Sequence, residues 1–206
     1  MKFQELRSII KEPMFSLQDL ALANAKVYPY QLNLWKKLGY IKLLKNGLYL
    51  FTNQQEGIDR NEIAHRMYQP SYISLESALS YYGIIPEIVT SITSVTTKTN
   101  RYFQNDFGKY NFRHIHSKYF WGYQSAQTQY GKFLIAEPEK ALIDYIYLNL
   151  GQLNNENDVS GIRINPIIYN QIIGRKKLNI YIKNYSIKKM KTIFKIINQQ
   201  CLPTNK

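Results

Sequence analysis

The chain has one cysteine and no long apolar segment, and each of these absences excludes a class of protein. The single cysteine, Cys201, can form neither an internal disulfide nor a metal centre built from several cysteines. No apolar run approaches the ~18–20 residues that a membrane-spanning helix needs, and residues 1–12 carry charges where a secretory signal would be apolar. We therefore expect a cytoplasmic protein. Its 206 residues are enough for one or two hydrophobic cores.

Known catalytic signatures are also missing. The sequence contains no P-loop, no G-x-S-x-G motif and no kinase or zincin pattern, so we expect no enzymatic activity and no cofactor. His114 and His116 alternate along an expected strand and share a face, as two metal ligands could, but no third ligand is evident nearby. We therefore expect no metal. A carboxylate site is conceivable at Glu137, Glu139 and Asp144, although the positive end of a helix explains the first two equally well.

Acidic residues are scarce, and their scarcity is uneven. The formal net charge is +13, from 27 basic and 14 acidic side chains. Residues 1–55 hold 8 basic and 3 acidic side chains, residues 56–165 hold 10 and 11, and residues 166–206 hold 9 and none. Such an excess attracts polyanions, whether nucleic acid, an acidic protein or a membrane surface. The distribution predicts two basic surfaces, one near each end of the chain.

Residues 1–55 show the pattern of a winged helix-turn-helix domain. Apolar residues spaced by three and four predict short helices, and Asn46-Gly47 between two strand-like runs is a strong hairpin signal. The helices are expected at 2–11, 17–25 and 28–38, and the strands at 41–44 and 48–51. In a winged helix the third helix enters the major groove of DNA and the hairpin flanks it.

Candidate contacts with DNA lie on the third expected helix, at the cap of the second, and at the hairpin tip. Asn and Gln can pair with adenine, while Lys and Tyr can reach phosphate or guanine. The alternative interpretation is a solvated helix face and a hairpin that only closes a small core; the local positive charge favours DNA. Leu34 fits neither face of the helix. The candidate residues are Ser16, Tyr28, Tyr30, Gln31, Asn33, Lys36, Lys37, Lys45 and Asn46.

Residues 56–206 indicate a second, larger domain. Helical periodicity and runs of β-branched and aromatic residues both occur. Helices are expected at 57–70, 75–83, 137–150, 166–173 and 186–200, strands at 91–97, 110–116, 119–124 and 131–136, and a polar loop at 152–161. The expected fold class is α+β, in which a winged helix precedes a mixed α/β domain with a small, mainly antiparallel sheet and flanking helices.

The C-terminal basic residues have two interpretations. A charged stripe on an amphipathic helix is usually its solvated face. The absence of acidic residues also allows a surface for a polyanion or a partner protein. The residues concerned are Arg175, Lys176, Lys177, Lys188, Lys191 and Lys195.

Four stretches together resemble the AbiEi-type antitoxins of abortive-infection toxin-antitoxin systems. They are "GYIKLLKNGLYLF" in the hairpin, "YISLESALSYYGIIPE" at 72–87, "SVTTK" at 94–98 and "IAEPEKALIDYIYL" at 135–148. The second and fourth are the specific ones, and the resemblance does not extend beyond Gly151. It implies a recognition helix at 28–38, a wing tip at 45–47 and an antitoxin domain from about residue 57. Many members of the family carry Arg, Ser or Thr in that helix, where this chain has Tyr, Gln, Asn and Lys, so the operator sequence cannot be transferred.

The resemblance implies an autorepressor that binds inverted repeats in its own promoter and counteracts a nucleotidyltransferase-like toxin. The expected partners are double-stranded DNA and that toxin, and no membrane. Two alternatives stay open from the residues alone. One is an RNA-binding or RNA-processing protein that acts through the basic C-terminal domain, and the other is a protein-interaction module.

Overall fold

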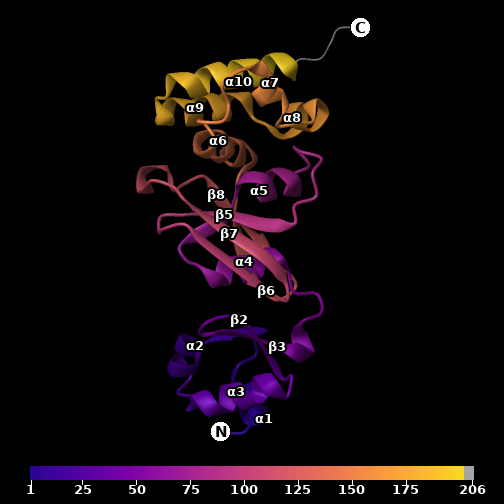
Figure 1. The fold of residues 1–206 in the computed structure, drawn as a ribbon, viewed down its shortest axis with the longest axis vertical. Coiled ribbons are helices and arrows are strands. Elements are labelled where there is room, and N and C mark those ends of the chain that lie inside the picture. Colours follow the sequence, from indigo (N-terminus) through magenta and orange to yellow (C-terminus); the bar gives the residue numbers. More distant parts are fainter. Residues whose placement is uncertain (202–206) are drawn as a thin grey trace.

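The computed structural model describes residues 1–201 and shows an elongated α+β protein with an N-terminal unit at one end (Figure 1). This unit contains three short helices and a three-stranded antiparallel sheet of order β1-β3-β2. Its elements are α1 (Phe3–Ile9), β1 (Met14–Ser16), α2 (Leu17–Leu22), α3 (Pro29–Lys37), β2 (Ile41–Lys45) and β3 (Leu48–Phe51). The expected helices and hairpin are confirmed. Strand β1 was not expected, because three residues are too few to show an alternating pattern.

The N-terminal unit has a small aromatic core of its own. Leu32 and Trp35, three residues apart on α3, place one face of that helix against it. The ring of Phe51 lies at its centre, 4.6 Å from the ring of Phe15 and 5.9 Å from that of Phe3. The remaining face of α3 is left to solvent.

The larger unit is built on a six-stranded mixed sheet of order β6-β7-β5-β4-β9-β8. Pairs β5–β7 and β4–β9 are parallel, whereas β4–β5, β6–β7 and β8–β9 are antiparallel. The sheet is therefore larger and less antiparallel than expected. The chain passes from β5 to β6 at the sheet edge and returns in β7, so β7 runs parallel to β5. The strands are β4 (Ser71–Ile73), β5 (Ser91–Thr96), β6 (Arg101–Asn105), β7 (Gly108–His114), β8 (Tyr123–Gln127) and β9 (Lys132–Ala136).

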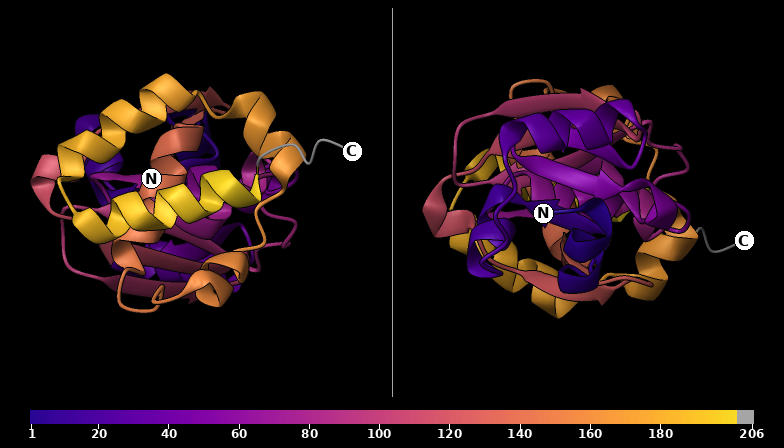
Figure 2. Two further views of the ribbon diagram at one scale, coloured as in Figure 1. Left: turned by 90° about the horizontal axis from the view of Figure 1, so that it is seen from above. Right: turned by 90° about the horizontal axis from the view of Figure 1, so that it is seen from below.

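Helices cover this sheet and form the opposite end of the molecule. Figures 1 and 2 show α9 and α10 as the outermost layer, with α6 between them and the sheet. The helices are α4 (Arg60–Met67), α5 (Leu75–Tyr81), α6 (Pro138–Leu148), α7 (Glu156–Ser160), α8 (Pro166–Ile172), α9 (Arg175–Tyr185) and α10 (Lys188–Gln200), and 3-10 turns lie at Thr52–Gln54 and Ser117–Tyr119. No helix within residues 1–201 is long and apolar enough to cross a membrane.

Several expectations about the larger unit are corrected, and strands β4 and β6 were not expected. The expected strand at 119–124 starts only at Tyr123, because a 3-10 turn and Gly122, with φ +73°, interrupt the extended backbone. The expected loop at 152–161 contains α7, which Asn155 caps. The helix has only five residues, too few to show a helical period in the sequence. Helix α9 was not expected at all, because the polar and basic side chains of its exposed face obscure the apolar stripe that includes Leu178 and Ile182.

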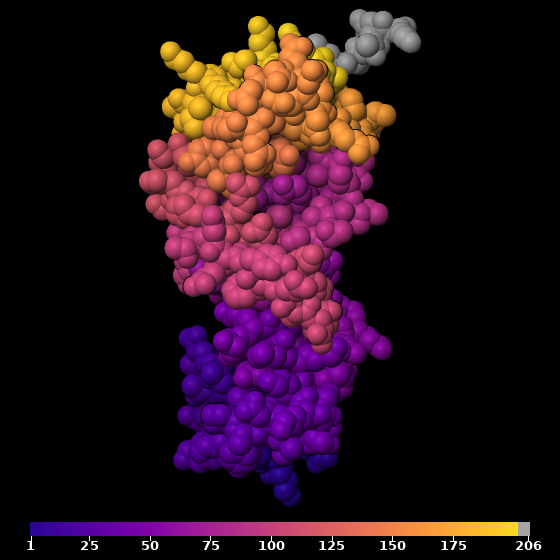
Figure 3. Space-filling model, viewed as in Figure 1, coloured from indigo at the N-terminus to yellow at the C-terminus, as the bar shows by residue number. Residues whose placement is uncertain are grey.

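Polar contacts and apolar packing join the two units. Asn105 donates a hydrogen bond from Nδ2 to the Leu44 carbonyl at 3.0 Å, and Lys42 forms an ion pair with Asp106 at 3.4 Å. A side chain of α4, Arg66, forms another with Asp19 at 2.7 Å. The N-terminal unit is thus a distinct lobe at one end of the molecule (Figure 3) that is fixed to the β6–β7 turn and to α4.

Candidate nucleic-acid interface and a buried charged cluster

Helix α3 lies on the side of the N-terminal unit that faces away from the larger sheet (Figure 1). Leu32 and Trp35 hold it against the core, which leaves Asn33, Lys36 and Lys37 exposed. No acidic residue occurs in the helix. Its outer face is therefore positive and carries one side-chain amide, a combination suited to phosphates and base edges.

Two tyrosines flank the first residue of α3. The rings of Tyr28 and Tyr30 are exposed and stacked, with centroids 5.9 Å apart and planes within 11°. Their hydroxyl groups can donate hydrogen bonds to phosphate oxygens. The structure thus brings together five predicted residues at or on α3: Tyr28, Tyr30, Asn33, Lys36 and Lys37.

The side chain of Gln31 does not belong to this face. It is only 9% exposed, and its Oε1 accepts a hydrogen bond from the Tyr28 backbone at 2.9 Å. Its Nε2 donates to the Met1 carbonyl at 2.6 Å. The amide of Gln31 therefore holds the start of α3 against the N-terminus, and the structure contradicts its predicted contact with DNA.

Ser16 has the capping role expected of it. Its Oγ accepts a hydrogen bond from the Asp19 backbone at 3.1 Å, while the Asp19 carboxylate accepts one from the Ser16 backbone at 2.7 Å. Burial alone would raise the pKa of Asp19, but the hydrogen bonds from Ser16 and the charge of Arg66 together hold it below its usual value. The hydroxyl oxygen of Ser16 is thus engaged within the protein.

The hairpin tip lies against β6 at the junction of the two units. Lys45 and Asn46 line an open cleft of about 550 Å³ together with Tyr68 and Arg101. Burial lowers the pKa of Lys45, and the positive charge of Lys98 lowers it further. The tip is therefore a fixed, basic edge of this cleft.

The predicted C-terminal basic residues divide into two groups. Lys177 is bound to carboxylates, with Nζ 3.1 Å from Glu137 and 3.3 Å from Glu139, so its charge is paired with α6 although the side chain is partly exposed. The others are exposed on α9 and α10: Arg175, Lys176, Lys188, Lys191 and Lys195.

The two candidate histidines do not share a strand face. His114 is the last residue of β7, where its Nδ1 lies 3.0 Å from the Lys98 carbonyl. His116 lies beyond the strand and accepts a hydrogen bond from the Lys118 backbone at 3.2 Å, which caps a 3-10 turn. Among residues 1–201 no group of three His, Cys, Asp or Glu side chains could hold a metal ion.

The three candidate carboxylates also fail to converge. Glu137 and Glu139 face α9, where Glu139 accepts a hydrogen bond from the Gly174 backbone at 2.8 Å and both bind Lys177. Asp144 instead lies in the core and is fully buried. A carboxylate site of the kind conceivable from the sequence is therefore absent from this helix.

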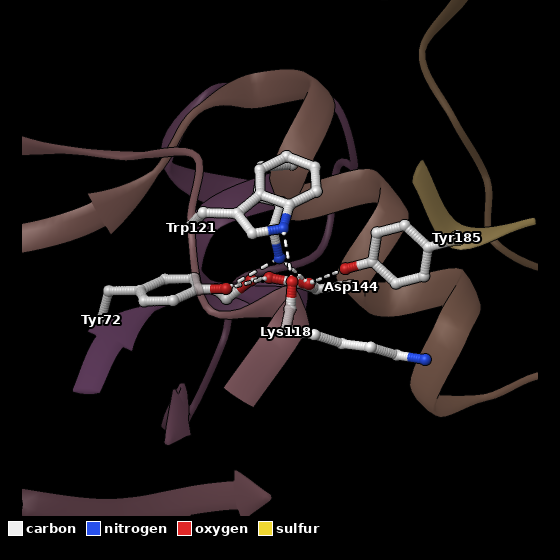
Figure 4. Close-up of polar contacts among 7 residues, drawn as sticks. Tyr72, Lys118, Trp121, Asp144 and Tyr185 are labelled. Carbon is white, nitrogen blue, oxygen red and sulfur yellow. Dashed lines mark hydrogen bonds and ion pairs between the residues drawn. The ribbon is translucent and has the colours of Figure 1, made fainter. Parts of the chain in front are cut away.

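Asp144 is the centre of a buried charged cluster that joins the sheet to two helices (Figure 4). It forms an ion pair with Lys140, one turn earlier on α6, and both side chains are 0% exposed. Its Oδ2 accepts hydrogen bonds from Tyr72 at 2.8 Å and Ser74 at 2.9 Å, and its Oδ1 accepts one from Tyr185 at 3.2 Å. Every polar group of the pair therefore has a partner within the protein.

Burial dominates the electrostatics of this cluster. It raises the pKa of Asp144 and lowers that of Lys140, although the attraction between the two charges acts in the opposite direction. The ring of Trp121 lies 5.2 Å from the Lys140 ammonium and that of Tyr72 lies 5.4 Å from it. The cluster is closed to solvent, and its contacts connect the sheet to α6 and α9. Its only signal in the sequence is a Lys and an Asp at i and i+4 on the apolar face of a helix.

Replacing Gly122 by Ala tests how tightly this cluster is packed. An added Cβ would lie 3.1–3.3 Å from the stem of Lys140, and the backbone has φ +73°. We expect a loss of about 2–5 kcal/mol in unfolding free energy, from backbone strain and overpacking together. Gly83→Ala is the matched control, with φ +69° and nothing within 4 Å; backbone strain alone should cost it about 1–2 kcal/mol. Equal losses in urea unfolding would contradict the proposed packing contact.

The geometry thus leaves one exposed candidate interface in the N-terminal unit, on α3, and one buried structural cluster. A scan against models of known protein families found no match to this chain, and a search of curated proteins found none either.

Proposed function

We propose that the protein is a DNA-binding transcriptional regulator whose N-terminal unit is a winged helix. The observation that carries the proposal is the outer face of α3, which exposes Asn33, Lys36 and Lys37 and contains no acidic residue. The element order α1-β1-α2-α3-β2-β3 supports it, because a winged helix consists of three helices followed by a hairpin that pairs with a short strand.

In this proposal the lysines and the amide have different roles. Lys36 and Lys37 bind phosphates and contribute affinity without sequence preference, whereas Asn33 pairs with a base edge. Tyr28 and Tyr30 contact the DNA backbone near the start of the helix. Helix α3 is accessible to DNA because it faces away from the larger unit (Figure 1).

We further propose that the protein is a cytoplasmic antitoxin that represses its own operon. This part is supported by the resemblance of two stretches in the larger unit to AbiEi-type antitoxins. One stretch, 72–87, begins within β4 and includes α5, and the other, 135–148, begins at the end of β9 and includes α6, which carries Lys140 and Asp144. These residues provide the framework of the domain that counteracts the nucleotidyltransferase-like toxin.

The experiment is DNA binding at several salt concentrations, measured by fluorescence anisotropy with the region upstream of the gene. Each lysine–phosphate contact adds about 0.9 to the slope of log affinity against log salt. Lys36→Ala/Lys37→Ala should therefore lower the slope by about 2 and weaken binding to all duplexes. The matched control is Lys188→Ala/Lys191→Ala, two exposed lysines on α10 at the far end. No binding by the wild type at 50 mM salt, or equal slopes for both variants, would overturn the proposal.

A further inference from the structure

Leu34 is an exposed leucine on the outer side of α3. Its side chain is 49% exposed, whereas the two core-facing residues of α3, Leu32 and Trp35, are 5% exposed each. At 100° per residue Leu34 projects between Tyr30 and Leu38, which are also exposed, and Lys37 projects on the far side of Tyr30. Leu34 lies outside the core of the N-terminal unit, and its exposed apolar surface is unfavourable in water.

The charges around Leu34 favour one kind of partner. In a symmetric contact between two copies of α3, each helix would bring its lysines close to a second helix that carries the same positive charges and no acid. Like charges brought together in this way are unfavourable, and Lys is depleted from the centres of protein interfaces. DNA supplies the opposite charge along both sides of the major groove. Charge complementarity therefore selects DNA as the occupant of this face.

The major groove offers one apolar group that suits a leucine, the C5-methyl group of thymine. Asn33, which precedes Leu34 in the helix, carries a side-chain amide that can pair with adenine at N6 and N7. Adjacent residues of a helix point 100° apart and are separated by 1.5 Å along its axis, so they can contact neighbouring base pairs.

We propose that Leu34 is a specificity-determining residue that contacts a thymine methyl, and that with Asn33 it selects adjacent A·T pairs in each half-site. This inference rests on the proposed DNA-binding function and adds the base class that α3 prefers. Leu34 contributes discrimination, while Lys36 and Lys37 contribute affinity that is independent of sequence.

The test uses the full chain and duplexes selected from a random pool for binding at 100 mM salt. Each thymine of the selected duplex is replaced in turn by deoxyuridine, which lacks only the methyl group. For the wild type we expect about a fourfold loss of affinity at one thymine of each half-site, the equivalent of one buried methyl group. Leu34→Ala should bind the thymine and deoxyuridine duplexes equally. Ile180→Ala, an exposed position on α9, is the control and should keep the fourfold difference.

The outcomes separate this inference from the proposed function. If the wild type selects no duplex, the DNA-binding function itself fails. If it selects and binds a duplex but no thymine is sensitive, or if Leu34→Ala keeps the same sensitivity, only the role of Leu34 is overturned. If sedimentation shows a wild-type dimer that Leu34→Ala converts to a monomer, Leu34 covers a second copy and the inference is likewise overturned.

Discussion

Replacing Asp144 by Ala is expected to lower the free energy of unfolding by about 3–5 kcal/mol, as for other buried ion pairs that lose one partner. The substitution leaves the ammonium of Lys140 buried and unpaired, and it removes the acceptor of three hydroxyl groups, those of Tyr72, Ser74 and Tyr185. Guanidinium unfolding followed by circular dichroism would measure the loss.

Two further variants show whether the unpaired charge is the cause. Lys140→Met/Asp144→Ala removes both charges and should regain part of the stability, because no ion is then left without a partner. Arg163→Ala breaks an exposed ion pair with Glu87, in which 67% and 41% of the two side chains are accessible, so its cost should stay below about 1 kcal/mol. If Asp144→Ala were no more harmful than Arg163→Ala, the buried pair would have no special role.

Replacing Phe51 by Ala is expected to unfold the N-terminal unit selectively. Phe51 is fully buried, and the guanidinium of Arg7 lies 4.4 Å from the centre of its ring in addition to the contacts with Phe15 and Phe3. Truncation of a buried phenylalanine costs about 3–5 kcal/mol. A small core loses a larger share of its stability from such a cavity than a large one does. Hydrogen exchange should show lost protection in α1 and α3 and retained protection in α6. DNA binding should disappear together with the protection of α3.

The control for this variant is Tyr102→Ala, an aromatic truncation on β6 at a position that is 56% exposed. It should leave protection unchanged in both units. Loss of protection in α6 as well as α3 after Phe51→Ala would mean that the two units unfold as one, and would contradict the independence of the N-terminal core.

Local signals explain which elements could be predicted from the sequence. The hairpin and helix α6 follow from short-range chemistry: Asn46-Gly47 at the turn, Pro138 at the first position of the helix and a continuous apolar stripe. Strand β4 gave no such signal, because all three of its residues are buried and do not alternate. Its place between β5 and β9, and the parallel pairings, depend on contacts between distant parts of the chain.

The candidate site shows the same limit. The exposed face of α3 was predicted from helical spacing, with the exception of Gln31, whose partner is the backbone of Met1 thirty residues away. Spacing along a helix does not reveal such a distant partner. Lys140 was not predicted to be buried because lysine is almost always exposed, and its partners Tyr72 and Tyr185 come from other elements.

The elongated shape has a consequence for how two partners would share the protein. Helix α3 lies at one tip, and the exposed lysines of α9 and α10 lie at the other. A ligand at one tip therefore leaves the other sterically free, so simultaneous occupancy by two large partners is permitted. Any cooperativity between the tips has to be transmitted through the contacts between the two units, which include the Arg66–Asp19 and Lys42–Asp106 ion pairs, the Asn105–Leu44 hydrogen bond and the apolar packing. Without a change in these contacts, the two binding free energies are additive.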